Sequence, residues 1–186
     1  MKSITILLLI ISFPLTVLCE NADPRVTLTM NIVDGYARGV LVNQTQNIIK
    51  YHPDVSKKAI YNVPACFSVF YKLKNSDEEF GPYKVKPTGF EMRKRGPDGK
   101  FSLNYSNIDS NSQVVYSGKA KLFLEYLSRW KIVDLENVNV VRIECGVDIR
   151  LESPTSATDY TIKQTTPWYT VKKNAENVFE FDTPIE

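Results

Sequence analysis

The stretch that decides the fold is Val141-Arg-Ile-Glu-Cys-Gly-Val-Asp-Ile-Arg-Leu151, in which every second side chain is apolar. Successive side chains of a strand point to opposite faces of a sheet, so this period predicts a long strand with one buried face. Shorter rows of the same period at residues 26–32 and 101–105 predict further strands, and Asp34-Gly35 predicts a turn. The chain is therefore expected to consist mainly of antiparallel sheet.

A second stretch, residues 54–70, carries apolar side chains at helical spacing and predicts one helix. Asp54 can cap its first turn, while Pro64 would kink the helix or mark its start. A strand over residues 66–73 is the alternative for the last part, and residues 119–130 fit a helix face as well as a strand face. The expected fold class is α+β, an antiparallel β-sheet wrapped around one helix, with an all-β sandwich as the alternative.

The first 19 residues predict a secretory signal peptide. Lys2 provides a positive start, and the apolar run that follows is shorter than a membrane span and contains Pro14. Cleavage after Cys19 would leave residues 20–186 as a single secreted domain with no membrane span.

The charges of the chain nearly balance, with 23 basic and 21 acidic side chains. A protein of this composition has no long-range field to attract the phosphate backbone of a nucleic acid, so a nucleic-acid partner is not expected. The one dense basic cluster, residues 93–95, is interpreted as the exposed tip of a hairpin.

Two features concern covalent modification in a secretory compartment. Cys66 and Cys145 remain after cleavage, and an even pair predicts one disulfide, with two buried thiols as the alternative. If the predicted helix packs on the long strand, both sulfurs point into the same interface. The sequons Asn43-Gln-Thr45 and Asn104-Tyr-Ser106 predict N-glycans at Asn43 and Asn104 where those loops are exposed.

The residues that carry most catalytic chemistry are scarce in this chain. His52 is its one histidine, which excludes a metal site built from several histidines. Neither a glycine-rich phosphate loop nor a zinc-type cysteine spacing occurs. The sequence therefore predicts a protein that is not an enzyme and that uses no metal and no cofactor.

Three segments, read in order, resemble the cystatin family of cysteine-protease inhibitors. Residues 53–59 are similar to the start of the cystatin helix, Gln113-Val-Val-Tyr-Ser-Gly118 to the first inhibitory hairpin, and Pro167-Trp168 to the second. The first hairpin has an extra residue before Gly118, and the chain has one cysteine pair where secreted cystatins usually have two. The resemblance implies a protease-binding wedge formed by Gln113, Val114, Val115, Tyr116, Ser117, Gly118, Pro167 and Trp168.

The resemblance leads to a first hypothesis about function. It implies a secreted inhibitor that fills the cleft of a papain-family cysteine protease without offering a cleavable bond, with Trp168 as an aromatic anchor. The alternative is a secreted β-rich interaction or immune-modulating protein without protease inhibition. A carrier that holds an apolar ligand under the helix is a third class. In the first two hypotheses the partner is a protein.

Overall fold

The computed structural model describes residues 25–51, 66–84, 93–95, 101–103, 106–152 and 157–185. Outside these ranges lie the predicted signal peptide, His52, most of the predicted helix and Asn104 of the second sequon. The strands are β1 (Val26–Val33), β2 (Tyr36–Asn43), β3 (Ile49–Tyr51), β4 (Phe67–Leu73), β5 (Glu79–Lys84), β6 (Arg93–Arg95), β7 (Phe101–Leu103), β8 (Ser106–Ile108), β9 (Ser112–Lys119), β10 (Val138–Glu152), β11 (Ala157–Thr165), β12 (Trp168–Lys173) and β13 (Phe179–Ile185).

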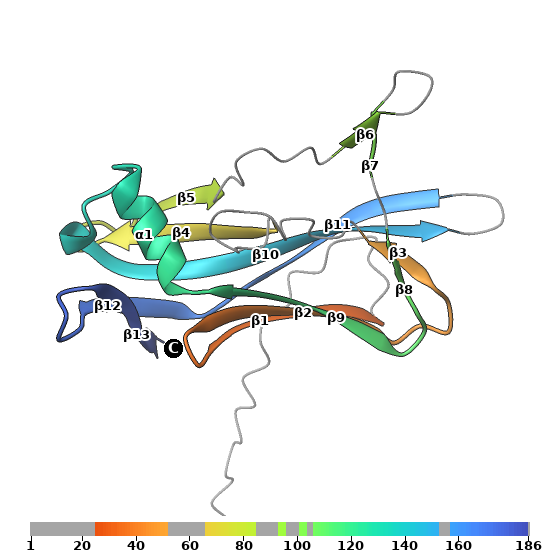
Figure 1. Ribbon diagram of the computed structural model, residues 1–186, viewed down its shortest axis with the longest axis horizontal. Coiled ribbons are helices and arrows are strands. Elements are labelled where there is room, and N and C mark those ends of the chain that lie inside the picture. Colours follow the sequence, from red (N-terminus) through yellow and green to blue (C-terminus); the bar gives the residue numbers. More distant parts are fainter. Residues whose placement is uncertain are drawn as a thin grey trace, which may run out of the picture.

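Strand β10 organises the larger of two antiparallel sheets that lie over one another, while β6 and β7 form a separate two-stranded pair. One of its sides pairs with β11 and then, further along, with β12, and the other side pairs with β4 and β3. Strands β13, β5 and β8 extend this sheet outward. The smaller sheet has the order β1-β2-β9. Figure 1 shows the two sheets lying over one another, with β10 running along the length of the larger one.

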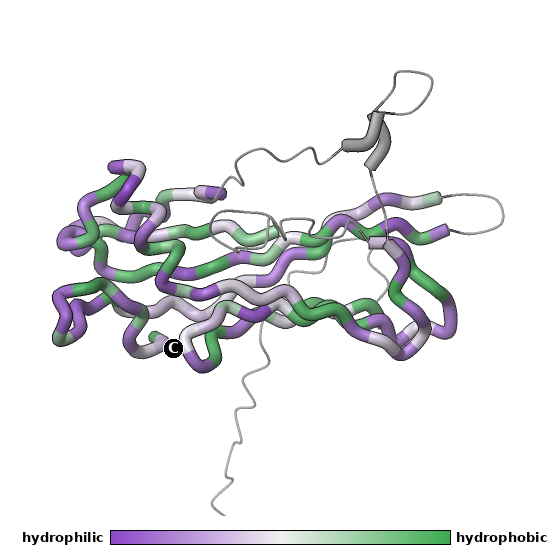
Figure 2. Tube along the Cα trace, in the orientation of Figure 1, coloured by the Kyte–Doolittle hydropathy of each residue, from purple (hydrophilic) through white to green (hydrophobic). Residues whose placement is uncertain are grey.

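The two faces of β10 confirm the predicted alternation. Ile143 and Cys145 are fully buried between the sheets, whereas Arg142 and Glu144 on the other face are partly exposed. On β2, a Cβ added to Gly39 would lie 3.0 Å from the Sγ of Cys145, so the two sheets approach closely there. Figure 2 shows apolar positions running along the strands of both sheets, while the turn between β12 and β13 is largely hydrophilic.

The predicted helix over residues 54–70 is wrong where the structure describes it. Residues 67–73 form β4, which pairs with β10 from Phe67 opposite Cys145 to Leu73 opposite Val138. Phe67, Val69 and Tyr71 are buried on one face, which is the period of a strand. Phe67 is the first apolar residue of this strand, and it also fits the helical spacing of residues 54–70. This stretch therefore matched the pattern of a strand and that of a helix.

The described α-helix lies later in the chain, at α1 (Lys121–Arg129), where the sequence fitted either a helix or a strand. Its side chains Phe123, Leu124 and Leu127 are fully buried, and the rings of Phe123 and Phe67 have centroids 6.0 Å apart. Figure 1 shows α1 at one end of the molecule, between β9 and the short helical turn that leads into β10. The helix covers that end of the stacked sheets.

The predicted α+β class, with a sheet wrapped around one helix, is therefore wrong. Two antiparallel sheets supply most of the ordered backbone, and the single described α-helix packs at their end. The alternative, an all-β fold, describes the molecule better. Within the described ranges, no helix is long and apolar enough to cross a membrane.

Candidate functional site

The segment predicted as the first inhibitory hairpin is part of a regular strand. Gln113 to Gly118 lie inside β9, which pairs with β2 from Gln113 opposite Val42 to Gly118 opposite Ala37. Tyr116 and Gly118 are buried. No hairpin tip exists at these residues, so the geometry that the cystatin resemblance implies for them is absent.

The second predicted segment, Pro167-Trp168, is not a hairpin tip either. Strands β11 and β12 both pair with the same side of β10, and Pro167 lies at the break between them. The Trp168 ring lies 4.7 Å from the guanidinium carbon of Arg142, which in turn lies 5.2 Å from the centroid of the Phe70 ring. Trp168 thus belongs to the larger sheet, and the structure does not join it to Gln113–Gly118 as a wedge.

Arg142 connects this row of side chains to β5. Its Nη2 donates a hydrogen bond of 2.7 Å to Oε1 of Glu79, and the Nζ of Lys72 lies 5.2 Å from the Trp168 ring. Cation–π contacts of this kind stabilise a surface by about 0.5–1 kcal/mol each. These contacts therefore have a structural explanation, which is the packing of side chains from neighbouring strands on one face of the larger sheet.

The two cysteines lie together, but Cys66 precedes β4, which pairs with β10, and does not lie on the predicted helix. The Sγ atoms of Cys66 and Cys145 are 3.3 Å apart, which is contact without a covalent bond. The backbone holds this approach, because the N–H of Gly146 donates to the carbonyl of Cys66 at 2.9 Å. The disulfide itself stays a prediction.

Asn43 is fully buried, and its side-chain amide has a structural role. Nδ2 donates to the carbonyls of Asn47, Ile108 and Asp109 at 2.8–3.1 Å, and Oδ1 accepts from the N–H of Thr45. These bonds join the loop after β2 to the segment between β8 and β9. A glycan on Nδ2 would have to replace them, so the glycosylation predicted at Asn43 does not fit this packing.

A cleft of about 710 Å³ lies at one end of the molecule. Three segments that are far apart in the sequence form its walls: the turn between β1 and β2, the junction of β9 with α1, and the hairpin of β12 and β13. No local pattern in the sequence predicts that these three segments lie close together. This cleft is the candidate functional site.

The first wall is a tight hairpin turn. Asp34 and Gly35 have φ angles of 52° and 75°, a left-handed pair that short β-hairpins favour. The N–H of Ala120, just before α1, donates to the carbonyl of Gly35 at 2.9 Å and ties the first wall to the second. Tyr36 follows the turn and is 37% exposed at the cleft.

The third wall is held by the side chain of Asn174. Its Oδ1 accepts from the N–H groups of Glu176 and Val178, both at 3.0 Å, and the backbone N–H of Asn174 donates to the carbonyl of Val178. The resulting turn presents Val178 with 39% of its surface exposed. Because its backbone is bonded at several points, this turn is a pre-formed part of the cleft.

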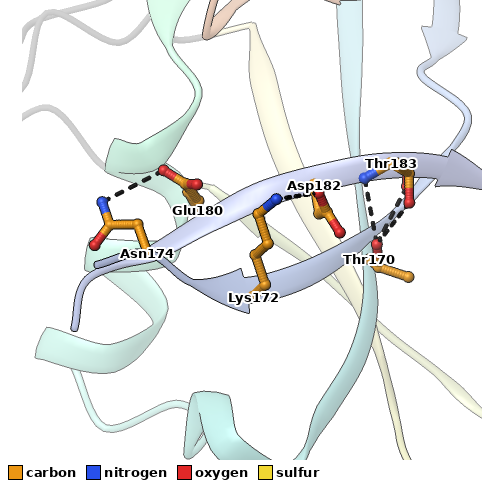
Figure 3. A network of polar contacts seen from close by, with 6 residues as sticks. All are labelled: Thr170, Lys172, Asn174, Glu180, Asp182 and Thr183. Atoms are coloured by element: carbon orange, nitrogen blue, oxygen red, sulfur yellow. Dashed lines mark hydrogen bonds and ion pairs between the residues drawn. The ribbon is translucent and has the colours of Figure 1, made fainter. Parts of the chain in front are cut away.

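Polar contacts between the two strands brace the same hairpin (Figure 3). Asn174 donates to Glu180, Lys172 to Asp182, and the hydroxyl of Thr170 lies within hydrogen-bond distance of Thr183. The hydrogen bond to the Asp182 carboxylate, together with its charge, raises the pKa of Lys172 above its ordinary value. The pairing with Asp182 therefore favours the charged form of Lys172.

Aromatic side chains form the apolar part of the cleft. The rings of Tyr169 and Phe181 meet edge to face, with centroids 5.9 Å apart, and Phe179 also lines the cleft. Tyr169 is nearly buried, whereas Phe179 and Phe181 are half-buried. The lining contains neither histidine nor cysteine. Across the described ranges, no group of three or more metal-ligating side chains is placed to hold an ion.

Comparisons with known proteins do not assign this chain to a family. No family model matches it, and no curated protein matches it. Among solved structures, the crystal structure of a protein from Archaeoglobus fulgidus is similar at 10% identity, covering 79% of this chain and 95% of that one, with a TM-score of 0.27. A likeness this low carries no argument about fold or function.

The sequence predicted one wall of the cleft but not that the three walls come together as a site. It predicted the Asp34-Gly35 turn of the first wall. It did not single out Asn174 or Val178, although Asn174-Ala-Glu-Asn177 has the composition of a turn.

Proposed function

We propose that this chain is a secreted β-rich interaction protein that binds a segment of a partner protein in the cleft between the β1–β2 turn and the β12–β13 hairpin. The observation that carries the proposal is that exposed apolar side chains, Tyr36 and Val178, meet there on turns held by hydrogen bonds. Binding sites are typically concave and pre-formed, with a mostly apolar lining and a few polar groups.

Binding rather than catalysis fits the chemistry of the lining. Its carboxylates come from Asp34, Glu176, Glu180 and Asp182, and most of these side chains are exposed to solvent. Two of the four already make side-chain hydrogen bonds within the hairpin. Groups in such surroundings are suited to recognising a charged partner, because they are accessible and stay ionised, although water and salt limit each exposed ion pair to about 1 kcal/mol or less.

The proposal is tested by selecting a displayed library of random peptides on the full secreted protein. The Val178→Ser variant removes apolar surface at the cleft, and Val115→Ser makes the same change at a 53% exposed position in β9, outside the cleft. We expect the selected peptides to bind the Val178→Ser variant about five-fold more weakly, since a partly buried valine contributes about 1 kcal/mol. Equal losses in both variants, or none in either, would contradict the proposal.

A further inference from the structure

The cleft follows the open edge of β13. Five consecutive residues, 178–182, line it. Successive side chains of a strand point to opposite faces, so lining by consecutive residues means that the cleft includes the edge of β13 as well as the face on which Tyr169 and Phe181 meet. In the part of the chain that the structure describes, β13 pairs with β12 alone and ends the larger sheet.

An open strand edge offers a row of N–H and C=O groups. No backbone hydrogen bond links β13 to any described strand other than β12. Such an edge is a template for an extended segment, which adds to the sheet as one more strand. The edge here lies in the cleft, which is also lined by the β1–β2 turn and the start of α1.

The charges around this edge are predominantly negative, although the whole chain has a net charge of +2. The lining contains four acidic and two basic side chains. Asp182 is paired with Lys172, and Lys121 lies 3.9 Å from Glu125. The charge of Glu180 also acts on Lys172, which is already paired with Asp182. Among the basic side chains of the lining, Lys119 makes no ion pair with another described residue and is left to offset Asp34, Glu176 and Glu180. The local excess is therefore two negative charges.

We infer that the segment bound in the cleft is an extended, lysine- or arginine-bearing stretch of another protein that adds a strand beside β13. This inference rests on the proposed function and names the class of partner for the same site. Main-chain hydrogen bonds to β13 supply affinity, Tyr36 and Val178 contact apolar side chains of the segment, and the carboxylates of Asp34, Glu176 and Glu180 select its cationic side chains.

The strand-addition part is tested with the selected peptides themselves. Two versions of one peptide are made, each N-methylated at alternate residues, so that only one version loses the N–H groups that would face β13. We expect one version to lose binding by ten-fold or more and the other to keep it. Equal loss, or equal retention, in both versions would overturn strand addition and leave the cleft as a docking site of another kind.

The charge part is tested with the double variant Asp34→Asn/Glu176→Gln. Asparagine also favours the left-handed backbone at position 34, so the turn is kept. We expect the selected peptides to be rich in lysine and arginine and to lose about five-fold in affinity for the double variant, since exposed ion pairs are worth up to about 1 kcal/mol each. The control is Glu78→Gln, an exposed carboxylate outside the cleft.

Three results would overturn the inference in distinguishable ways. Selected peptides without basic residues that still respond to Val178→Ser would refute the charge selection and leave the proposed function standing. Peptides whose binding is insensitive to Val178→Ser would refute both this inference and the proposed function. A protein that sediments as a dimer without peptide, and as a monomer in the Val178→Ser variant, would show that the occupant is a second copy of this chain.

Discussion

The middle of the sandwich and its cleft end are built in opposite ways. In the middle, Gly39 lies against Cys145, and Ile143 is fully buried between the sheets, so shape and the exclusion of water decide the packing. At the cleft end, Val178 and Tyr36 stay exposed on turns held by polar bonds. We therefore expect substitutions in the middle to change the stability of the fold, and substitutions at the cleft to change binding.

The largest effect on stability is expected where α1 meets the core. Phe123→Ala removes a fully buried ring that packs against Phe67, and we expect it to lower the free energy of unfolding by about 3–5 kcal/mol. Trp130→Ala, at the end of the same helix where the side chain is 61% exposed, should cost less than about 1 kcal/mol. Urea denaturation of both variants checks this, and similar losses in the two would show that α1 is not docked as described.

The next effect concerns the buried amide of Asn43. Asn43→Ala leaves the carbonyls of Ile108 and Asp109 without their side-chain donor, and we expect a loss of about 2–3 kcal/mol in unfolding free energy. Asn107→Ala, at an exposed position in β8, serves as the control and should be close to neutral. Glycopeptide mapping of the protein expressed through a secretory pathway should find no glycan at Asn43; a glycosylated Asn43 in fully folded protein would contradict the packing.

A smaller effect tests how closely the two sheets approach. Gly39→Ala places a methyl group 3.0 Å from the Sγ of Cys145, and we expect a loss of about 1–3 kcal/mol. Gly146→Ala is the matched control in β10, because its added Cβ would meet Lys163 at an ordinary 3.5 Å. Adding Cys145→Ala to Gly39→Ala should recover part of the loss, and strictly additive thermal shifts would mean that the two positions are not in contact.

The smallest effect appears only at alkaline pH. Burial, aided by the neighbouring Tyr83 hydroxyl, raises the pKa of Tyr71 from 10.0 to about 12. A raised pKa in the folded state means that the contribution to stability is complete below pH 10 and is lost as the pH rises toward 12. The thermal unfolding temperature of the wild type should therefore fall over this window. Tyr71→Phe should show a shallower decline, and an equally steep one would assign the effect to other groups.

The sequence predicted the secondary structure best where only one periodic pattern fitted the residues. In residues 141–151 only the period of a strand fits, and β10 contains that whole stretch. At residues 67–70 the apolar side chains satisfied a helix and a strand, and pairing with β10 over seven positions decided for the strand. Such pairing depends on residues about seventy positions away, so no local pattern contains it.

The candidate site was less predictable than the fold for the same physical reason. The Asp34-Gly35 turn follows from local backbone preferences, and the sequence predicted it. The cleft exists because that turn lies near Lys121 and Val178, which come from α1 and from the turn between β12 and β13. The Gln113–Gly118 segment shows the reverse error, since a motif that suggested an exposed tip is a strand paired along its whole length.

The account depends most directly on where a bound segment touches the molecule. Isotope-labelled full-length protein, titrated with a selected basic peptide, reports this through the backbone amide shifts in its NMR spectrum. The account predicts that the largest shifts fall on residues 178–183, with further shifts at Asp34 and Tyr36 across the cleft. Shifts confined to the outer side of β9 around Val115, or to Trp130, would contradict it.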